Sequence, residues 1–298
     1  MRLLLIYYTG TYNTRYLTEK IKQGFVMRKW QVDTVEIDSK TRPCSCEGYD
    51  LIGFSYPIYG FNSPLPFNKY VRSLKFFPGQ QYFIYKNSGE TMAMNNASSR
   101  ILIRYMKKNK CSLVGEYHYV MPYNIHFPFE NEFVKQIFTM NDKLMEIMFY
   151  NLEHNIVEEI KSNFIYNIAA FFVGIQKIGG NVNSFLYNIN RDKCTQCGLC
   201  VRNCPQQNIY VKNGKIKFHH HCDMCMRCSF FCPTDAINIG FLQGWKVNNP
   251  YNYKKIEEDN SIDSNYINEK SKGFYKCFIK YFENIDNRYS EKIRDKSK

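Results

Sequence analysis

Eight of the twelve cysteines stand in two copies of one spacing, and that spacing is typical of iron–sulfur ligation. Each copy reads C-x-x-C-x-x-C-x-x-x-C followed by proline, and together they comprise Cys194, Cys197, Cys200, Cys204, Cys222, Cys225, Cys228 and Cys232. Three thiolates two residues apart can surround one face of an iron–sulfur cubane, whereas the fourth thiolate of the run cannot reach the same cluster. The spacing therefore predicts two 4Fe–4S clusters.

The fourth cysteine of each run is expected to bind the cluster of the other run. This exchange predicts one cluster on Cys194, Cys197, Cys200 and Cys232, and a second on Cys222, Cys225, Cys228 and Cys204. Pro205 and Pro233 follow the two fourth cysteines and would hold the chain in a fixed turn beside the ligand. Zinc is the alternative, but structural zinc usually takes two C-x-x-C pairs separated by a longer spacer.

The rest of the chain contains little that indicates secretion or a membrane. Met1 and Arg2 precede an apolar run of only six residues without a small-residue cleavage site, which argues against a signal peptide. The apolar segment from Phe164 to Ile175 is too short to span a bilayer. We therefore expect a cytoplasmic protein without a membrane span, because thiols stay reduced in that compartment. Free thiols are expected at Cys44, Cys46, Cys111 and Cys277.

The formal net charge of +13 overstates how basic the loaded protein would be. An oxidised cubane with four thiolates carries about −2, so two clusters subtract roughly four charges. Basic residues without an intervening acid occur at Arg100, Arg104, Lys107, Lys108 and Lys110. This run is interpreted either as a solvated helix face or as a docking surface for an acidic redox partner protein. Nucleic acid is the least favoured partner.

The first half of the sequence alternates apolar strands with helical segments. Strands are predicted at residues 2–8, 31–37, 50–56, 82–85 and 112–121, and a helical stripe of Leu17, Ile21 and Phe25 follows the first of them. A second helical pattern covers residues 131–161. This alternation predicts an α/β fold with a doubly wound parallel sheet. Such sheets bind ligands at the carboxyl ends of their strands.

Three loops are expected to meet at that edge of the sheet. They are Thr9-Gly10-Thr11-Tyr12-Asn13-Thr14, Pro57-Ile58-Tyr59-Gly60-Phe61 and Asn87-Ser88-Gly89. The first combines hydroxyls with backbone N–H groups at a helix N-terminus, which suits a phosphate. The three loops resemble those of flavodoxin. Over residues 1–250 the whole arrangement resembles the family of fused flavodoxin–ferredoxin proteins, whose phosphate loop is of the Ser-Gly-Thr-Gly-Asn-Thr type.

The resemblance implies that the first domain binds FMN. Its phosphate would lie among Thr9, Gly10, Thr11, Asn13 and Thr14. The flavin ring would pack on Tyr59 within the loop Pro57, Ile58, Tyr59, Gly60 and Phe61, with Asn87, Ser88 and Gly89 on the opposite side. Tyr12 departs from the family pattern, because it stands where the family has its second glycine.

The resemblance also implies the domain organisation. Residues 1–165 would form a flavodoxin-like domain, residues 166–190 a connecting segment, and residues 191–245 a small α+β ferredoxin-type domain with two 4Fe–4S clusters. Residues 246–298 form a polar tail. An aromatic stretch in that tail, from Phe274 to Phe282, predicts a short helix that folds back onto the core.

These features predict an electron-transfer protein that relays electrons between two 4Fe–4S clusters and an FMN. No acid–base or nucleophilic constellation is identified. One alternative is a flavin-dependent reductase of a small molecule. The other is a ferredoxin whose flavodoxin-like domain has lost FMN through Tyr12, by backbone strain or by blocking the phosphate, and now serves as a partner-binding module.

Overall fold

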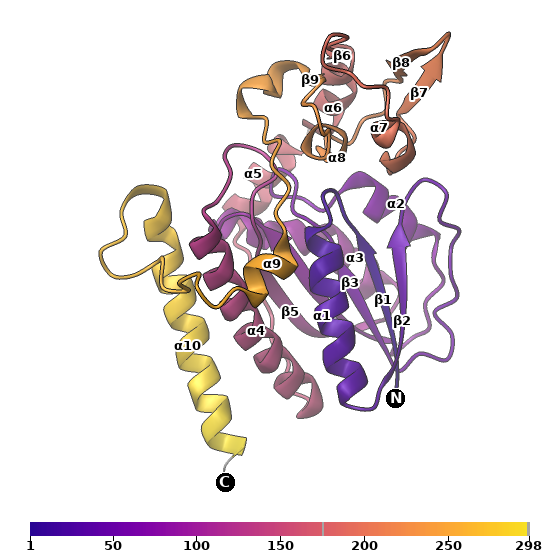
Figure 1. Ribbon diagram of the computed structural model, residues 1–298. Coiled ribbons are helices and arrows are strands. Elements are labelled where there is room, and N and C mark those ends of the chain that lie inside the picture. Colours follow the sequence, from indigo (N-terminus) through magenta and orange to yellow (C-terminus); the bar gives the residue numbers. More distant parts are fainter. Residues whose placement is uncertain (175, 297–298) are drawn as a thin grey trace.

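The computed structural model describes residues 1–174 and 176–296, and its main element is a five-stranded parallel sheet with the order β2-β1-β3-β4-β5 (Figure 1). The strands are β1 (Arg2–Tyr8), β2 (Gln31–Ile37), β3 (Leu51–Ser55), β4 (Gln81–Ser88) and β5 (Ser112–Val120). This order is the one found in flavodoxin-like doubly wound sheets, so the predicted fold class is confirmed. All five predicted strands are present, and β4 is longer than its predicted range of 82–85.

Helices cover both faces of the sheet. They are α1 (Asn13–Met27), α2 (Leu65–Ser73), the 3-10 helix η1 (Ala93–Ser99), α3 (Arg100–Lys108) and α4 (Asn131–Glu153). Strand β1 lies inside the sheet, between β2 and β3, and both of its faces are apolar, as expected for a strand that helices cover on both sides. Leu3 and Leu5 pack with α1 and α4, whereas Leu4 and Ile6 pack with α2 and α3 on the other face.

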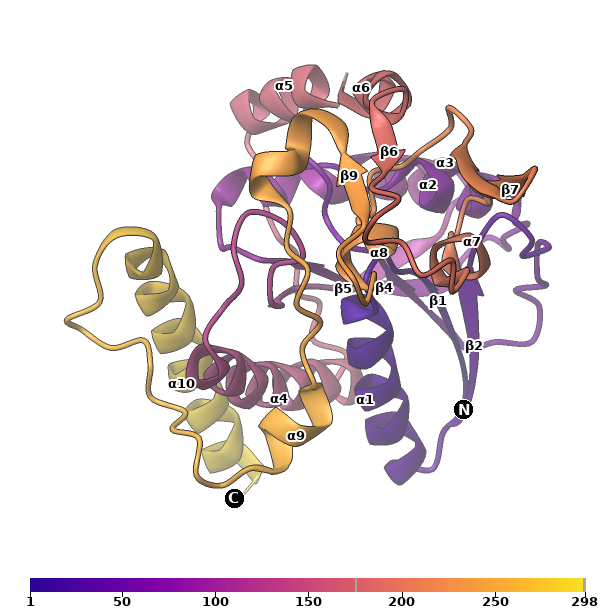
Figure 2. The same cartoon turned by 45° about the horizontal axis from the view of Figure 1, so that its top comes forward.

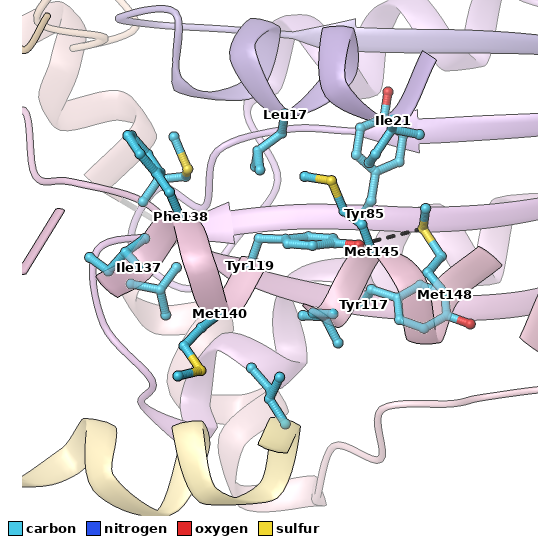
Figure 3. Close-up of a cluster of buried hydrophobic side chains, with 14 of the residues drawn as sticks. Leu17, Ile21, Tyr85, Tyr117, Tyr119, Ile137, Phe138, Met140, Met145 and Met148 are labelled. Atoms are coloured by element: carbon cyan, nitrogen blue, oxygen red, sulfur yellow. Dashed lines mark hydrogen bonds between the residues drawn. The ribbon is translucent and has the colours of Figure 1, made fainter. Parts of the chain in front are cut away.

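The larger core lies between the sheet and helices α1 and α4. Figure 3 shows Leu17 and Ile21 of α1 on one side of this core and Ile137 and Met148 of α4 among its other members. The Tyr119 hydroxyl donates to the Met148 sulfur at 3.5 Å, so the one polar atom of that ring has a partner inside the core. This packing fixes the direction of α1, whose N-terminus lies at the carboxyl edge of the sheet.

Helix α4 ends at Glu153, eight residues before the predicted end of the helical pattern at residue 161. The chain then runs along the outer edge of β5, where Glu158 pairs with Gly115 and the Glu116 amide donates to the Glu158 carbonyl at 2.7 Å. This segment satisfies backbone groups that the edge strand would otherwise expose. The tertiary pairing therefore outweighs the helical periodicity.

The last part of the chain returns to the sheet domain through α9 (Tyr253–Glu258), η3 (Gly273–Tyr275) and α10 (Lys276–Lys296), which lies alongside α4 (Figure 2). Helix α10 has 21 residues and is longer than the expected short helix. The reason is that Phe278, Phe282 and Ile285 follow one another at helical spacing and are all buried in the same core as α4.

The cysteine runs lie in a second, smaller unit at the carboxyl edge of the sheet (Figure 1). Its elements are β6 (Tyr187–Ile189), α7 (Leu199–Asn203), β7 (Ile209–Lys212), β8 (Lys215–Phe218), α8 (Arg227–Phe230), β9 (Ile237–Ile239) and the 3-10 helix η2 (Gly240–Trp245). Strands β6 and β9 pair antiparallel, so residues that the sequence assigned to the connection belong to this unit, which we call the cysteine module.

Two helices join the sheet domain to the cysteine module, α5 (Phe164–Val173) and α6 (Gln176–Ser184). Ile175, the last residue of the apolar segment noted in the sequence, lies outside the described residues. No helix in the described ranges combines the length and the apolar character needed to cross a membrane.

Candidate functional site

The cysteine module contains two small cavities, each lined by four cysteines. One is lined by Cys194, Cys197, Cys200 and Cys232, and the other by Cys204, Cys222, Cys225 and Cys228. In both, three cysteines come from one run and the fourth comes from the other run. These are the two sets that the exchanged spacing predicts. We call them the first cysteine set and the second cysteine set, after the run that contributes three members.

The backbone follows the same path in the two runs. Residues with positive φ occur at equivalent places, at Gln196 and Met224, at Gly198 and Met226, and at Gln207 and Asp235. Each turn brings backbone N–H groups toward sulfur, and both the Asn208 and the Ala236 amide donate to a fourth-cysteine Sγ at 3.2 Å. Such hydrogen bonds stabilise thiolates and help to set cluster potentials.

A larger cavity of about 640 Å³ lies between the carboxyl edge of the sheet and the cysteine module. All thirteen residues predicted to bind a flavin line it, namely Thr9, Gly10, Thr11, Asn13, Thr14, Pro57, Ile58, Tyr59, Gly60, Phe61, Asn87, Ser88 and Gly89. The loops that carry them follow β1, β3 and β4, so the parallel sheet brings them to one edge.

Threonine hydroxyls in this cavity are arranged to donate to an anion. The Thr14 oxygen accepts from the Asn87 amide at 2.8 Å, and the Thr11 oxygen accepts from the Asn124 amide at 2.8 Å. Each hydroxyl therefore keeps its proton free for a further acceptor. The Thr9 hydroxyl is buried and has no partner within the described ranges. Together with the N-terminus of α1, these groups suit a phosphate.

Tyr12 does not line this cavity. It has a φ of 73° at the N-cap of α1, a backbone conformation that glycine adopts at lower cost. Its ring points toward the cysteine module and lies 5.2 Å from the ring of Phe231, with the guanidinium of Arg227 at 4.6 Å. The tyrosine that replaces the family glycine therefore packs between the two units and leaves the phosphate loop open.

Arg227, which lies between two cysteines of the second run, binds the phosphate loop directly. It is 7% exposed, and its guanidinium donates to the carbonyl oxygens of Thr9 at 2.6 Å and of Gly10. Gly10 permits this close approach, because a Cβ there would clash with the Tyr59 hydroxyl and would lie 2.9 Å from the Cys225 carbonyl oxygen. The second run is thus held against the loop that would bind a flavin phosphate.

The large cavity and the cavity of the second cysteine set share part of their walls, since Cys222, Asp223 and Met226 line both. Burial raises the pKa of Asp223 to about 7, with Lys69 opposing the shift. Burial, followed by the nearby Cys225, raises the pKa of Tyr59 well above its usual range, so its hydroxyl stays protonated. Among the residues that the structure describes, none lines both the large cavity and the cavity of the first cysteine set.

A buried ion pair supports the loop after β4. Lys86 and Glu116 are both at most 1% exposed, and their charged atoms lie 2.7 Å apart. Burial lowers the pKa of the adjacent His118 to about 3, with the charge of Lys86 as the second cause, so the imidazole is neutral. His118 Nε2 lies 2.7 Å from the Ser88 hydroxyl. The network holds one wall of the large cavity in place.

Several lining residues were missed by the sequence prediction. Asn124 and His126 follow β5, and the rule that ligands bind at carboxyl ends of strands would have found this fifth loop. Phe241 and Trp245 of η2 also line the cavity, but no sequence signal connects them to the sheet. They arrive there because the Ile125 segment pairs with Lys246 of the cysteine module.

Comparison with known proteins identifies the cysteine module. Residues 193–237 match the family model of the 4Fe-4S dicluster domain. A ferredoxin of Methanothermococcus thermolithotrophicus is 36% identical over 55 residues, which cover 17% of this chain and 92% of that protein. A dihydromethanopterin reductase (acceptor) of Methanosarcina mazei is 32% identical over 77 residues, which cover 24% of this chain and only 32% of that protein.

The sheet domain has more distant structural neighbours. Oxidised flavodoxin 1 of Bacillus cereus is 15% identical, with a TM-score of 0.35, and the match covers 49% of this chain and 98% of that chain. The flavodoxin-like fold of the sheet domain follows from its own strand order, β2-β1-β3-β4-β5.

Proposed function

We propose that this chain, which belongs to the ferredoxin family through its cysteine module, is an electron-transfer protein that couples two 4Fe–4S clusters to an FMN. One observation carries the proposal. The cavity lined by every residue predicted to bind a flavin has a wall in common with the cavity of the second cysteine set. A flavin and a cluster in these two cavities would be separated by the side chains of that wall alone.

The eight cysteines would hold the two clusters in the exchanged arrangement. Each cavity is lined by four cysteines, which is the number of thiolates that one cubane requires. The backbone amides of Asn208 and Ala236 would stabilise the thiolate form of Cys204 and Cys232. Thiolate ligands of this kind survive in a reducing compartment, and we therefore propose a cytoplasmic location.

The FMN phosphate would lie at the N-terminus of α1. Hydroxyl protons of Thr11 and Thr14 remain free to donate, and the Thr9 hydroxyl has no other partner in the part of the chain that the structure describes. A helix N-terminus adds favourable electrostatics for an anion. The outward direction of Tyr12 supports this proposal over the alternative in which tyrosine abolishes FMN binding.

When bound, FMN exchanges one or two electrons and each cluster exchanges one, so the protein would convert between paired and single electrons. The chain would set the distance between the flavin and the clusters. Arg227 holds the second run against the phosphate loop, while Cys197 of the first run is exposed. We therefore propose that the flavin side faces the interior and that a redox partner protein meets the first cysteine set at the surface.

One observation favours a second candidate function. The large cavity extends beyond the predicted flavin residues to His126, Phe241 and Trp245, which leaves aromatic walls that a small molecule can contact. In this alternative the protein is a flavin-dependent reductase and the clusters are an internal relay. Steady turnover of a quinone or nitro compound by the purified protein without any partner would distinguish this alternative from the electron carrier.

Anaerobic purification followed by cofactor counting tests the proposal. We expect about eight irons, about eight acid-labile sulfides and about one FMN per chain, because each cubane contains four of each inorganic atom. Colourless, sulfide-free material would contradict the whole proposal. Eight irons with no flavin, after incubation with excess FMN, would contradict only the assignment of the large cavity.

A further inference from the structure

We propose that a basic surface around the first cysteine set docks an acidic one-electron redox protein. The inference rests on the proposed function and deepens it, because it assigns a surface and a partner chemistry to the exposed end of the protein. The surface, called the first-run basic surface, consists of Arg191, Lys193, Arg202, Lys212, Lys215 and Lys217.

Five of these six residues lie within two positions of a residue that lines the cavity of the first cysteine set, and the sixth, Lys212, pairs with Lys215. Lys193 directly precedes Cys194, and Arg202 belongs to α7, which contacts β7. Ile216 of β8 lines the cavity itself. Figure 1 shows the β7–β8 hairpin projecting away from the sheet domain, and its residues Lys212, Lys215 and Lys217 are exposed. A protein that binds here meets Cys197, which is exposed.

The charge of this surface is nearly all of one sign. Between residues 191 and 218 the six basic residues are accompanied by a single acid, Asp192. All six are exposed, and none makes an ion pair in the part of the chain that the structure describes. Two other basic residues of the cysteine module, Arg227 and Lys246, do pair with carboxylates, so unpaired charge is confined to the end that carries the first set.

The hairpin keeps two lysines in an unfavourable arrangement. Lys212 and Lys215 are direct cross-strand partners, and like charges opposite one another destabilise a pair of strands. Strand alternation places Lys215 and Lys217 on the face opposite Ile216, which faces the cavity. An acidic surface that docks on the hairpin would relieve this repulsion. The hairpin is therefore suited to bind a partner protein whose surface carries carboxylates.

The basic run in α3 provides a matched comparison. Arg104, Lys107 and Lys108 are also exposed, but α3 packs on the sheet and none of its residues lines a cysteine cavity. Opposite charges steer partners toward each other and raise association rates by about ten-fold to a thousand-fold at low salt. Only charges next to the first cysteine set should change the rate of electron entry.

The experiment measures electron transfer from a reduced acidic bacterial two-cluster ferredoxin to the oxidised protein by stopped-flow absorbance. The test variant is Lys193→Gln with Lys215→Gln and Lys217→Gln. The control is Arg104→Gln with Lys107→Gln and Lys108→Gln, which removes the same charge. At low salt we expect the second-order rate constant of the test variant to fall about tenfold, because steering is lost. The rate constant of the control variant should stay within about twofold of the native value. Added salt should lower the native rate constant, and it should lower that of the test variant less.

Several results would overturn this inference without touching the proposed function. An equal loss in both variants, or a native rate that is independent of salt, would show that the first-run basic surface does not dock the donor. Tight binding of a short single-stranded oligonucleotide at physiological salt, lost only in the test variant, would assign the surface to nucleic acid. Iron and sulfide counts on all three proteins separate these results from failure of the proposed function, which would leave the native protein without clusters.

Discussion

The two cysteine runs have the same spacing and the same backbone turns, yet their surroundings differ. In the second run Met226 and Arg227 are buried, at 5% and 7% exposure, and Arg227 binds the carbonyl oxygens of Thr9 and Gly10 in the sheet domain. In the first run the position equivalent to Arg227 is Leu199, and Cys197 is exposed. The ligands decide what each run can bind. The residues between the ligands decide which run faces the large cavity and which faces solvent.

The largest effects are expected when one cysteine ligand is removed from either run, and the two variants should differ in FMN binding. We expect Cys222→Ser and Cys194→Ser each to lower the iron content from about eight to about four per chain, because each destroys one cubane. Of these two cysteines, Cys222 lines the large cavity and Cys194 does not, so only the Cys222→Ser variant should also bind FMN more weakly. Iron, sulfide and flavin counts check both statements, and equal flavin occupancy in the two variants would contradict the shared wall.

A single arginine should account for much of the contact between the second run and the phosphate loop. Arg227→Met removes the hydrogen bonds to the carbonyls of Thr9 and Gly10, and each bond to a charged group contributes about 1.5–3 kcal/mol. We expect the Kd for FMN, measured by fluorescence titration, to rise at least about tenfold. Arg202→Met at the exposed first run is the control and should leave FMN affinity unchanged.

A smaller effect is expected at the tyrosine between the two units. In Tyr12→Gly the positive φ becomes unstrained, but the contact with Phe231 is lost, so the two changes oppose each other. Because Tyr12 does not line the large cavity, we expect FMN affinity to change by less than about threefold. Flavin binding by the glycine variant alone would instead support the alternative in which this chain has lost FMN.

A separate prediction concerns the pH dependence of stability, at the wall of the large cavity that Ser88 lines and His118 supports. The folded-state pKa of His118 is about 3, below the value of about 6.5 for an unfolded histidine. Since only the unfolded state takes up this proton between those values, His118 should reduce stability as the pH falls from about 6.5 toward 3, with a slope of about 1.4 kcal/mol per pH unit.

Urea unfolding of the anaerobic protein at several pH values tests this slope. The variant His118→Gln should flatten it, and replacement of the exposed His154 by Gln should not. An unchanged slope in His118→Gln would mean that the buried imidazole is not the group responsible. The Ser88 contact would then have no influence on the acid sensitivity of the cavity wall.

Prediction from the sequence succeeded where local pattern and local chemistry coincide. The strands β1 and β2 have the predicted ends, because β1 is a continuous apolar run and β2 intersperses polar residues among apolar ones, and both patterns are local. It failed where a distant segment intervenes. Helix α4 stops at Glu153 because the following residues pair with β5, and β6 belongs to the cysteine module because it pairs with β9. Neither pairing has a local signature.

By itself, the sequence determined the chemistry of the cysteine module, since thiolate spacing along a short loop limits what the loop can surround. It also indicated that the loops after β1, β3 and β4 line the large cavity, because parallel strands bring their following loops to a single edge. Only the tertiary structure decided that Arg227 binds the phosphate loop and that Tyr12 points away from the large cavity. It also decided that the second run faces the sheet domain while Cys197 of the first run faces solvent. These facts depend on contacts between residues more than 200 positions apart, which no local pattern contains.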